Sequence, residues 1–161
     1  MEGSTHFVGL DIGGTTVKAA LLNESGRQVG DGVEVRSHGS DGYQATFKQL
    51  RAAIDQLCSD NSIESSNITA VGIDVPAPSS DGVIWGQANL NEDWVGTNIR
   101  DEFSKEIHRP CYMTNDGTLL LTVNGSCVQD TMALYFLWHQ GPDSVGALFL
   151  ARDNYMKDAM V

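Results

Sequence analysis

The chain has 161 residues, 41% of them hydrophobic, which fits one ordinary domain with a packed core and argues against wholesale disorder. Its formal net charge of -11 would repel phosphate-rich partners, so binding to nucleic acid or to an anionic membrane surface is not expected. No apolar run is long enough to span a bilayer, no signal peptide is recognisable, and the three cysteines form no CxxC pair. These features predict a cytoplasmic protein with reduced thiols.

The first part of the chain predicts three consecutive strands. Residues 7–12 and 15–22 are rich in β-forming side chains and are separated by a pair of glycines. A cluster of turn residues then precedes residues 28–36, which alternate loosely between apolar and polar. Three strands joined by tight turns predict an antiparallel meander.

A long amphipathic helix follows the meander. Its apolar residues recur at steps of four and three, which places them on one helical face. These residues are Tyr43, Phe47, Leu50, Ile54 and Leu57. Residues 71–75 then predict a short strand, and Asp81-Gly82 predicts a turn into residues 83–85.

A second helix and a further strand complete the pattern. Thr97 or Asn98 is the expected N-cap, and Pro110 ends the helix. The expected buried residues are Ile99, Phe103 and Ile107. Residues 111–113 predict the last strand. The order of three strands, helix, strand, helix and strand is that of an α/β, ribonuclease-H-like (actin-like ATPase) lobe, here incomplete.

Three short motifs carry candidate chemistry. The first is Asp11 at the end of a strand, followed by Gly13, Gly14 and Thr15. Glycine amides can approach a phosphate closely, a threonine adds a hydroxyl, and the aspartate can hold Mg²⁺. A plain hairpin turn explains the same residues equally simply.

The second motif is Asn115-Asp116, at the end of the last predicted strand. A carboxylate there can take a proton from a substrate hydroxyl during phosphoryl transfer, while the asparagine orients that hydroxyl. The alternative is an ordinary helix N-cap. The third motif is a polar loop that contains Asn89 and Trp94, which could contact a sugar or could be a surface loop with a tucked tryptophan.

Taken together and in order, these motifs resemble the ROK family of sugar kinases, over roughly residues 6 to 120. The matching segments are Asp11 to Thr15, residues 72–78, Asn89-Leu90 with Trp94, and residues 112–116. The resemblance implies that Gly13, Gly14 and Thr15 line the phosphates of ATP. It also implies that Asp11 serves Mg²⁺.

For the sugar, the resemblance implies that Asn89 and Asn115 bind hydroxyls and that Asp116 is the catalytic base. Five positions depart from the family pattern. Thr16 stands where lysine is frequent, Asp74 and Ala77 stand where glycines are usual, and Gly117-Thr118 stands where Ala-Asn is usual. The change at Thr16 affects a phosphate contact, and the changes at Asp74 and Ala77 affect the shape of the sugar pocket.

Residues 121–161 differ from residues 1–120, which we expect to be the sugar-kinase lobe. The resemblance implies a second glycine-rich loop, a Glu-x-Gly-His motif and often a zinc site, and none occurs in this stretch. Read one base out of frame, the codons of residues 140–147 permit a Gly-Thr-Gly-Phe-Gly-Gly-Gly run. We therefore expect the reading frame to slip near Leu120 or Leu121; the alternative is a divergent or alternatively encoded tail.

The resulting expectation is an ATP-dependent kinase that phosphorylates a hexose or N-acetylhexosamine, with little or no turnover from this chain alone. The alternative is a non-catalytic sugar-binding or regulatory fragment of the same family. The expected partners are a sugar and ATP, with self-association through a bare lobe face.

Overall fold

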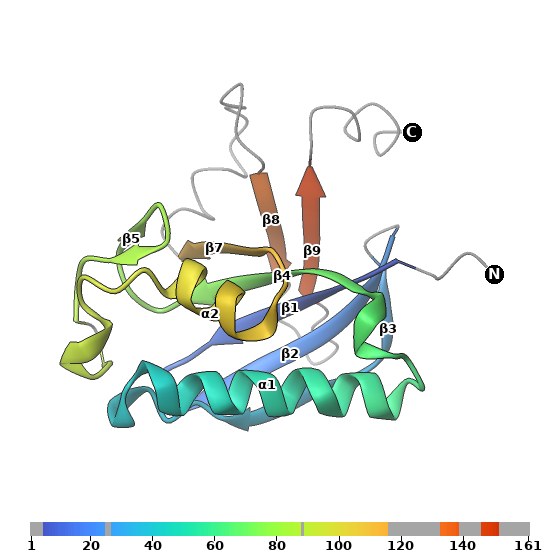
Figure 1. Cartoon of the computed structure of the whole chain (residues 1–161), viewed down its shortest axis with the longest axis horizontal. Coiled ribbons are helices and arrows are strands. Elements are labelled where there is room, and N and C mark those ends of the chain that lie inside the picture. Colours follow the sequence, from blue (N-terminus) through green and yellow to red (C-terminus); the bar gives the residue numbers. More distant parts are fainter. Residues whose placement is uncertain (1–4, 25–26, 88, 116–132, 139–145, 152–161) are drawn as a thin grey trace.

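The structure is a computed structural model that describes residues 5–24, 27–87, 89–115, 133–138 and 146–151. Its main body is a five-stranded sheet with two helices against one face (Figure 1). Within the described ranges, no helix is both long and apolar enough to cross a bilayer.

The main sheet has the strand order β3-β2-β1-β4-β7. The antiparallel pairs of β1 (His6–Ile12) with β2 (Thr16–Asn23) and of β2 with β3 (Gln28–Arg36) confirm the predicted meander. β4 (Ile68–Val75) pairs in parallel with β1, and β7 (Cys111–Asn115) pairs in parallel with β4. The carboxyl ends of β1, β4 and β7 therefore share one edge of the sheet, where α/β proteins commonly bind ligands.

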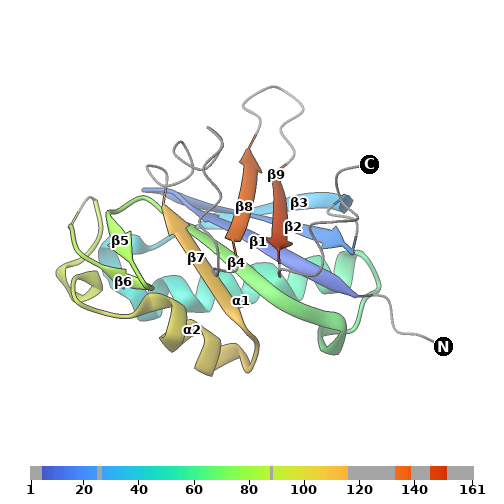
Figure 2. The same ribbon diagram turned by 90° about the horizontal axis from the view of Figure 1, so that it is seen from above.

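Both predicted helices, α1 (Tyr43–Asp60) and α2 (Ile99–Ile107), cover the same face of the sheet (Figures 1 and 2). The N-cap of α2 is Asn98, whose side-chain oxygen accepts a hydrogen bond from the Asp101 amide at 3.0 Å. This bond satisfies one of the amides left over at the start of a helix. The helix ends ahead of Pro110, as expected.

The core lies between the sheet and the helices. Of the five residues predicted to form the buried face of α1, four are buried and Tyr43 is partly buried. The rings of Phe47 and Phe103 lie 4.9 Å apart between centroids and join α1 to α2. Alternate residues of β1 and β4 complete this layer; they are Val8, Leu10, Ile12, Val71, Ile73 and Val75.

A small hairpin follows β4. Its strands are β5 (Ser79–Ser80) and β6 (Val83–Ile84), joined by Asp81 and Gly82 with φ angles of 51° and 88°. Two successive positive φ angles are the requirement of a type I′ turn, which Asp-Gly meets well. The predicted turn at this position is therefore confirmed.

Three short 3₁₀ helices were not expected from the sequence: η1 (Gly39–Asp41), η2 (Ser65–Asn67) and η3 (Glu92–Trp94). A separate antiparallel pair, β8 (Ala133–Trp138) and β9 (Gly146–Ala151), lies over the sheet face opposite the helices (Figure 2).

Two parallel strands are longer than the sequence predicted. β4 begins at Ile68 rather than at residue 71, and β7 ends at Asn115 rather than at residue 113. β4 is longer because its first residues pair with β1, for example Ile68 with His6. The local sequence could not predict this pairing, since β1 is distant along the chain. The extension of β7 brings Thr114 opposite Asp74.

Candidate phosphate and sugar site

A row of polar residues crosses four strands of the main sheet. The register places Lys18 of β2 opposite Asp11 of β1. It then places Asp11 opposite Asp74 of β4, and Asp74 opposite Thr114 of β7. Side chains directly opposite one another in neighbouring strands share a face of the sheet. We call these four residues the polar row.

The polar row faces away from the helices. Leu10 and Ile12, on either side of Asp11, are buried in the core under α1 and α2. Ile73 and Val75 flank Asp74 in the same way. Because successive side chains of a strand point to opposite faces, the two aspartates belong to the other face. Asp74 is nevertheless only 7% exposed.

The strand β1 leads directly into the turn of Gly13, Gly14 and Thr15. The Gly13 amide donates a hydrogen bond to the Thr16 carbonyl at 2.8 Å and closes the turn. The amides of Gly14 and Thr15 donate no hydrogen bond to any described residue, and both residues are exposed. Successive unpaired amides are a recurrent anion-binding arrangement. The turn thus offers two amides rather than three.

The internal packing of the chain does not explain the missing side chain at Gly14. Its φ angle is not positive, and a Cβ added there would meet nothing within 4 Å. A Cβ on Gly13, in contrast, would lie 3.0 Å from the Thr16 carbonyl oxygen. The space over Gly14 is therefore open to a group that approaches the backbone closely, as a phosphate does.

Asn89 lies exposed on the loop between β6 and η3. In the same loop Trp94 is fully buried, and its Nε1 donates to the Gly39 carbonyl at 3.1 Å. The tucked alternative for Trp94 is therefore correct. The exposed aromatic residue of this corner is Trp85, just after β6, with 65% of its surface accessible.

Asn115 is the last described residue of β7 and lies opposite Val75 in the register. Asp116, the predicted base, and its helix-cap alternative lie outside the described residues. The strand that precedes Asp116 ends at the same edge of the sheet as β1 and its glycine turn.

The sequence predicts no site role for Lys18 or Ser37, and Asp74 stands out in it only as a departure from the family pattern. Counting residues back from the glycine turn could have placed Lys18 opposite Asp11. Nothing local could have found Ser37, because its hydroxyl bonds to Gly14, 23 residues earlier in the chain.

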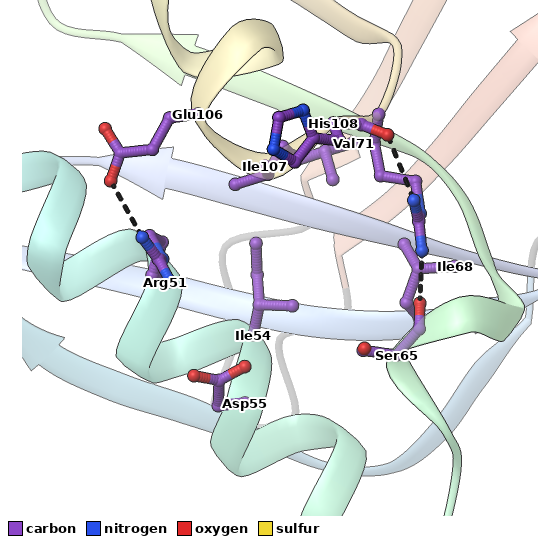
Figure 3. A pocket seen from close by; sticks show the side chains of 10 residues that line it. Arg51, Ile54, Asp55, Ser65, Ile68, Val71, Glu106, Ile107 and His108 are labelled. Atoms are coloured by element: carbon purple, nitrogen blue, oxygen red, sulfur yellow. Dashed lines mark hydrogen bonds and ion pairs between the residues drawn. The ribbon is translucent and has the colours of Figure 1, made fainter.

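A pocket of about 220 Å³ lies on the helix-covered side, between α1, α2 and the start of β4 (Figure 3). Arg51 and Glu106 form an ion pair at its rim, 3.4 Å apart. Ile68, the first residue of β4, lines this pocket, whereas Asp74 is near the other end of that strand. None of the site residues predicted from the sequence lines it.

The two carboxylates of the polar row suit a metal ion that is also bound by the phosphates of a substrate. The part of the chain that the structure describes contains no group of three or more His, Cys, Asp or Glu side chains that could hold a metal ion. Asp11 and Asp74 supply two carboxylates from neighbouring strands. Mg²⁺ is usually bound by one or two carboxylates together with substrate phosphates and water, so the two aspartates fit that ion.

The two described cysteines belong to the core rather than to the polar row. Burial raises the pKa of Cys111 to about 12, with a smaller contribution from Asp101. Burial, and secondarily Asp55, raises the pKa of Cys58. Both thiols stay protonated at neutral pH, which excludes them as nucleophiles.

The model of the ROK family matches residues 7–122. The chain belongs to the ROK family. This ROK chain is 27% identical over 115 residues to the glucokinase of Halalkalibacterium halodurans, a match that covers 70% of the chain and 34% of the glucokinase. It is 25% identical over 101 residues to the polyphosphate glucokinase of Mycobacterium leprae, with 62% and 29% covered. The chain thus spans about a third of the length of these curated relatives.

Solved structures agree on the fold. The inorganic polyphosphate/ATP-glucomannokinase from Arthrobacter sp. strain KM superposes with a TM-score of 0.63 at 19% identity, over 91% of this chain and 58% of that one. The ROK hexokinase from Thermus thermophilus gives 0.60 at 23% identity, over 91% and 47%. The predicted actin-like ATPase fold is confirmed.

Proposed function

We propose that this ROK chain carries the sugar-binding and first phosphate-binding half of an ATP-dependent sugar kinase. The reaction would move the γ-phosphoryl group of ATP to a hydroxyl of a hexose or an N-acetylhexosamine. The observation that carries the proposal is the polar row beside an open glycine turn, at the edge shared by β1, β4 and β7. Homologous glucokinases support the reaction class.

On the phosphate side, the Gly14 and Thr15 amides donate hydrogen bonds to phosphate oxygens. Asp11 and Asp74 offer carboxylate oxygens to Mg²⁺, and Lys18 brings a positive charge into the same row. These local hydrogen-bond donors and positive charges are needed because a chain with a net charge of -11 repels the phosphates of ATP at long range. Bound ATP supplies the phosphoryl group, and Mg²⁺ offsets the negative charge of its oxygens.

On the sugar side, Asn89 and Asn115 hold and orient hydroxyl groups, and Asp116 accepts the proton of the attacking hydroxyl. Asn89 lies on the loop after β6, and Asn115 is the last residue of β7. Catalysis then rests on positioning and on charge stabilisation rather than on covalent chemistry with the protein.

We propose further that residues 121–161 do not complete the kinase, because their reading frame has slipped near Leu120 or Leu121. The stretch lacks the family's second glycine-rich loop, and the ROK match ends at residue 122. Turnover by this chain is then expected to be very low. Sequencing the coding DNA tests the idea: a shifted frame without the Gly-Thr-Gly-Phe-Gly-Gly-Gly run would end it.

Binding and turnover need separate measurements. Isothermal titration of the purified chain with glucose, mannose and N-acetylhexosamines, with and without MgATP, is expected to show binding of at least one sugar. A coupled assay with ATP or polyphosphate as donor is expected to show little product. Polyphosphate is included because two of the similar proteins are named polyphosphate glucokinase and polyphosphate/ATP-glucomannokinase. The absence of any sugar or nucleotide binding contradicts the proposal. Sugar binding without nucleotide binding favours the non-catalytic alternative.

A variant of the turn tests the phosphate half. Gly14→Ala should fold normally, since its Cβ meets nothing within 4 Å, but should weaken MgATP binding because the methyl group occupies the open space. The control is Gln56→Ala, an exposed position on α1. Equal MgATP affinity in both variants would place the nucleotide elsewhere.

A further inference from the structure

Ser37 is a buried residue that bonds to the glycine turn with both of its hydrogen-bond donors. It follows β3, and its accessible surface is 0%. Its amide donates to the Thr15 carbonyl at 2.9 Å, and its Oγ donates to the Gly14 carbonyl at 3.2 Å. Two successive carbonyl groups of the turn are thus held from one side by a single residue.

These bonds fix the direction of the neighbouring amide. The Gly14 carbonyl and the Thr15 N–H belong to one peptide unit, and none of the peptide bonds between described residues is cis. In a planar trans unit the C=O and the N–H point in opposite directions. Because the Gly14 carbonyl points at buried Ser37, the Thr15 N–H points away from the interior, on an exposed residue.

The loop that follows Ser37 is fixed by hydrogen bonds and by packing. Two residues later, the Gly39 carbonyl accepts hydrogen bonds from the Trp94 indole at 3.1 Å and from the Asn91 amide at 2.9 Å. Leu90 also packs against Gly39, where an added Cβ would come within 2.8 Å of it. The loop that carries Asn89 and the glycine turn are therefore connected through residues 37–39.

We propose that Ser37 is a positioning residue, which holds the Gly14–Thr15 peptide so that the Thr15 N–H is directed at a phosphate oxygen of the bound donor. The proposal rests on the proposed function of the turn as a phosphate site. Ser37 touches no ligand in this account. Its effect passes through the orientation of one peptide unit, so its loss weakens phosphate binding more than it disturbs the fold.

The test is an NMR titration of the full ¹⁵N-labelled chain with inorganic phosphate and with MgATP, following the Thr15 and Gly14 amide signals. In the unchanged protein both signals are expected to shift and saturate. In Ser37→Ala the apparent affinity should fall roughly five- to tenfold, the worth of one well-formed hydrogen bond. The matched control is Ser104→Ala, which removes a hydroxyl bonded to the Arg109 carbonyl at 2.6 Å. Its affinity should stay within about twofold.

The outcomes distinguish the role of Ser37 from the proposed function of the glycine turn. If Ser37→Ala binds phosphate as tightly as the Ser104→Ala control, the positioning role is wrong while the proposed function stands. If neither turn amide of the unchanged protein responds to phosphate or MgATP, both proposals fail. Ser37→Cys covers the case in which the alanine variant does not fold. It has a similar shape and a weaker donor, so a smaller loss is expected, and an unchanged affinity overturns the role.

Discussion

The two faces of the main sheet show how one set of strands serves two purposes. On β1 and β4, alternate residues such as Leu10 and Ile73 are fully buried under the helices. The residues next to them, Asp11 and Asp74, belong to the opposite face and to the polar row. Because successive residues of a strand point to opposite faces, a core residue and a residue of the proposed site are next to each other in the sequence. Substitutions at these neighbouring positions should therefore affect different properties, stability at one and ligand binding at the other.

The largest effect is expected on the helix-covered face. Leu10→Ala should lower the free energy of unfolding by about 2–5 kcal/mol, because it removes fully buried methyl groups and leaves a cavity. Urea denaturation followed by circular dichroism measures the loss. A loss below about 1 kcal/mol would show that this face is not the core that the packing indicates.

The neighbouring residue should behave in the opposite way. Asp11→Asn is expected to change the unfolding free energy by less than about 1 kcal/mol, while MgATP binding weakens at least about tenfold, because a carboxylate is lost from the polar row. Titration calorimetry with and without EDTA checks the cause. The variant should bind ATP with Mg²⁺ about as weakly as the unchanged protein does after EDTA treatment. Retained Mg²⁺ dependence would count against a metal role for Asp11.

A helix cap separates stability from binding. Asn98→Ala should cost about 1 kcal/mol, since the side-chain oxygen of Asn98 caps the Asp101 amide at the start of α2. MgATP affinity should not change, because α2 lies on the face away from the polar row. The control is Ser66→Ala, whose exposed hydroxyl bonds only to Glu64 among the described side chains. A drop in affinity without a drop in stability would contradict the separation of the two faces.

The smallest effect concerns the buried thiol of β7. The pKa of Cys111 is raised from 9.0 to about 12, chiefly by burial, so the folded state keeps a proton that the unfolded state releases earlier. The stabilisation is full below pH 9 and declines as the pH rises towards 12. Between about pH 8 and pH 9.5 the unchanged protein should lose less than about 1 kcal/mol more than Cys111→Ala loses. Equal pH slopes in urea denaturation would show that the thiol is not shielded from water.

The sequence predicted the features that depend on local pattern. The apolar spacing of Phe47, Leu50 and Ile54 predicted α1, and Asp81-Gly82 predicted the turn between β5 and β6. Both signals lie within a few residues of the chain. The polar row was not predictable in the same way. Asp74 meets Asp11 only through the parallel register of β1 and β4, which hydrogen bonds between strands distant in sequence determine. Ser37 was not predicted for the same reason, because its partner Gly14 is distant in the sequence. The role of Asp116 as catalytic base remains a prediction.

Paramagnetic broadening with Mn²⁺ in place of Mg²⁺, together with ATP, on the ¹⁵N-labelled chain locates the nucleotide and its metal. We predict binding beside the polar row, so that the amide signals of residues 11–15, Asp74 and Thr114 broaden first, while signals of α1 such as Ala53 stay sharp. Preferential broadening around Asp55 and Glu106, which line the pocket between α1 and α2, would contradict it, because the nucleotide and its metal would then lie on the wrong face of the sheet.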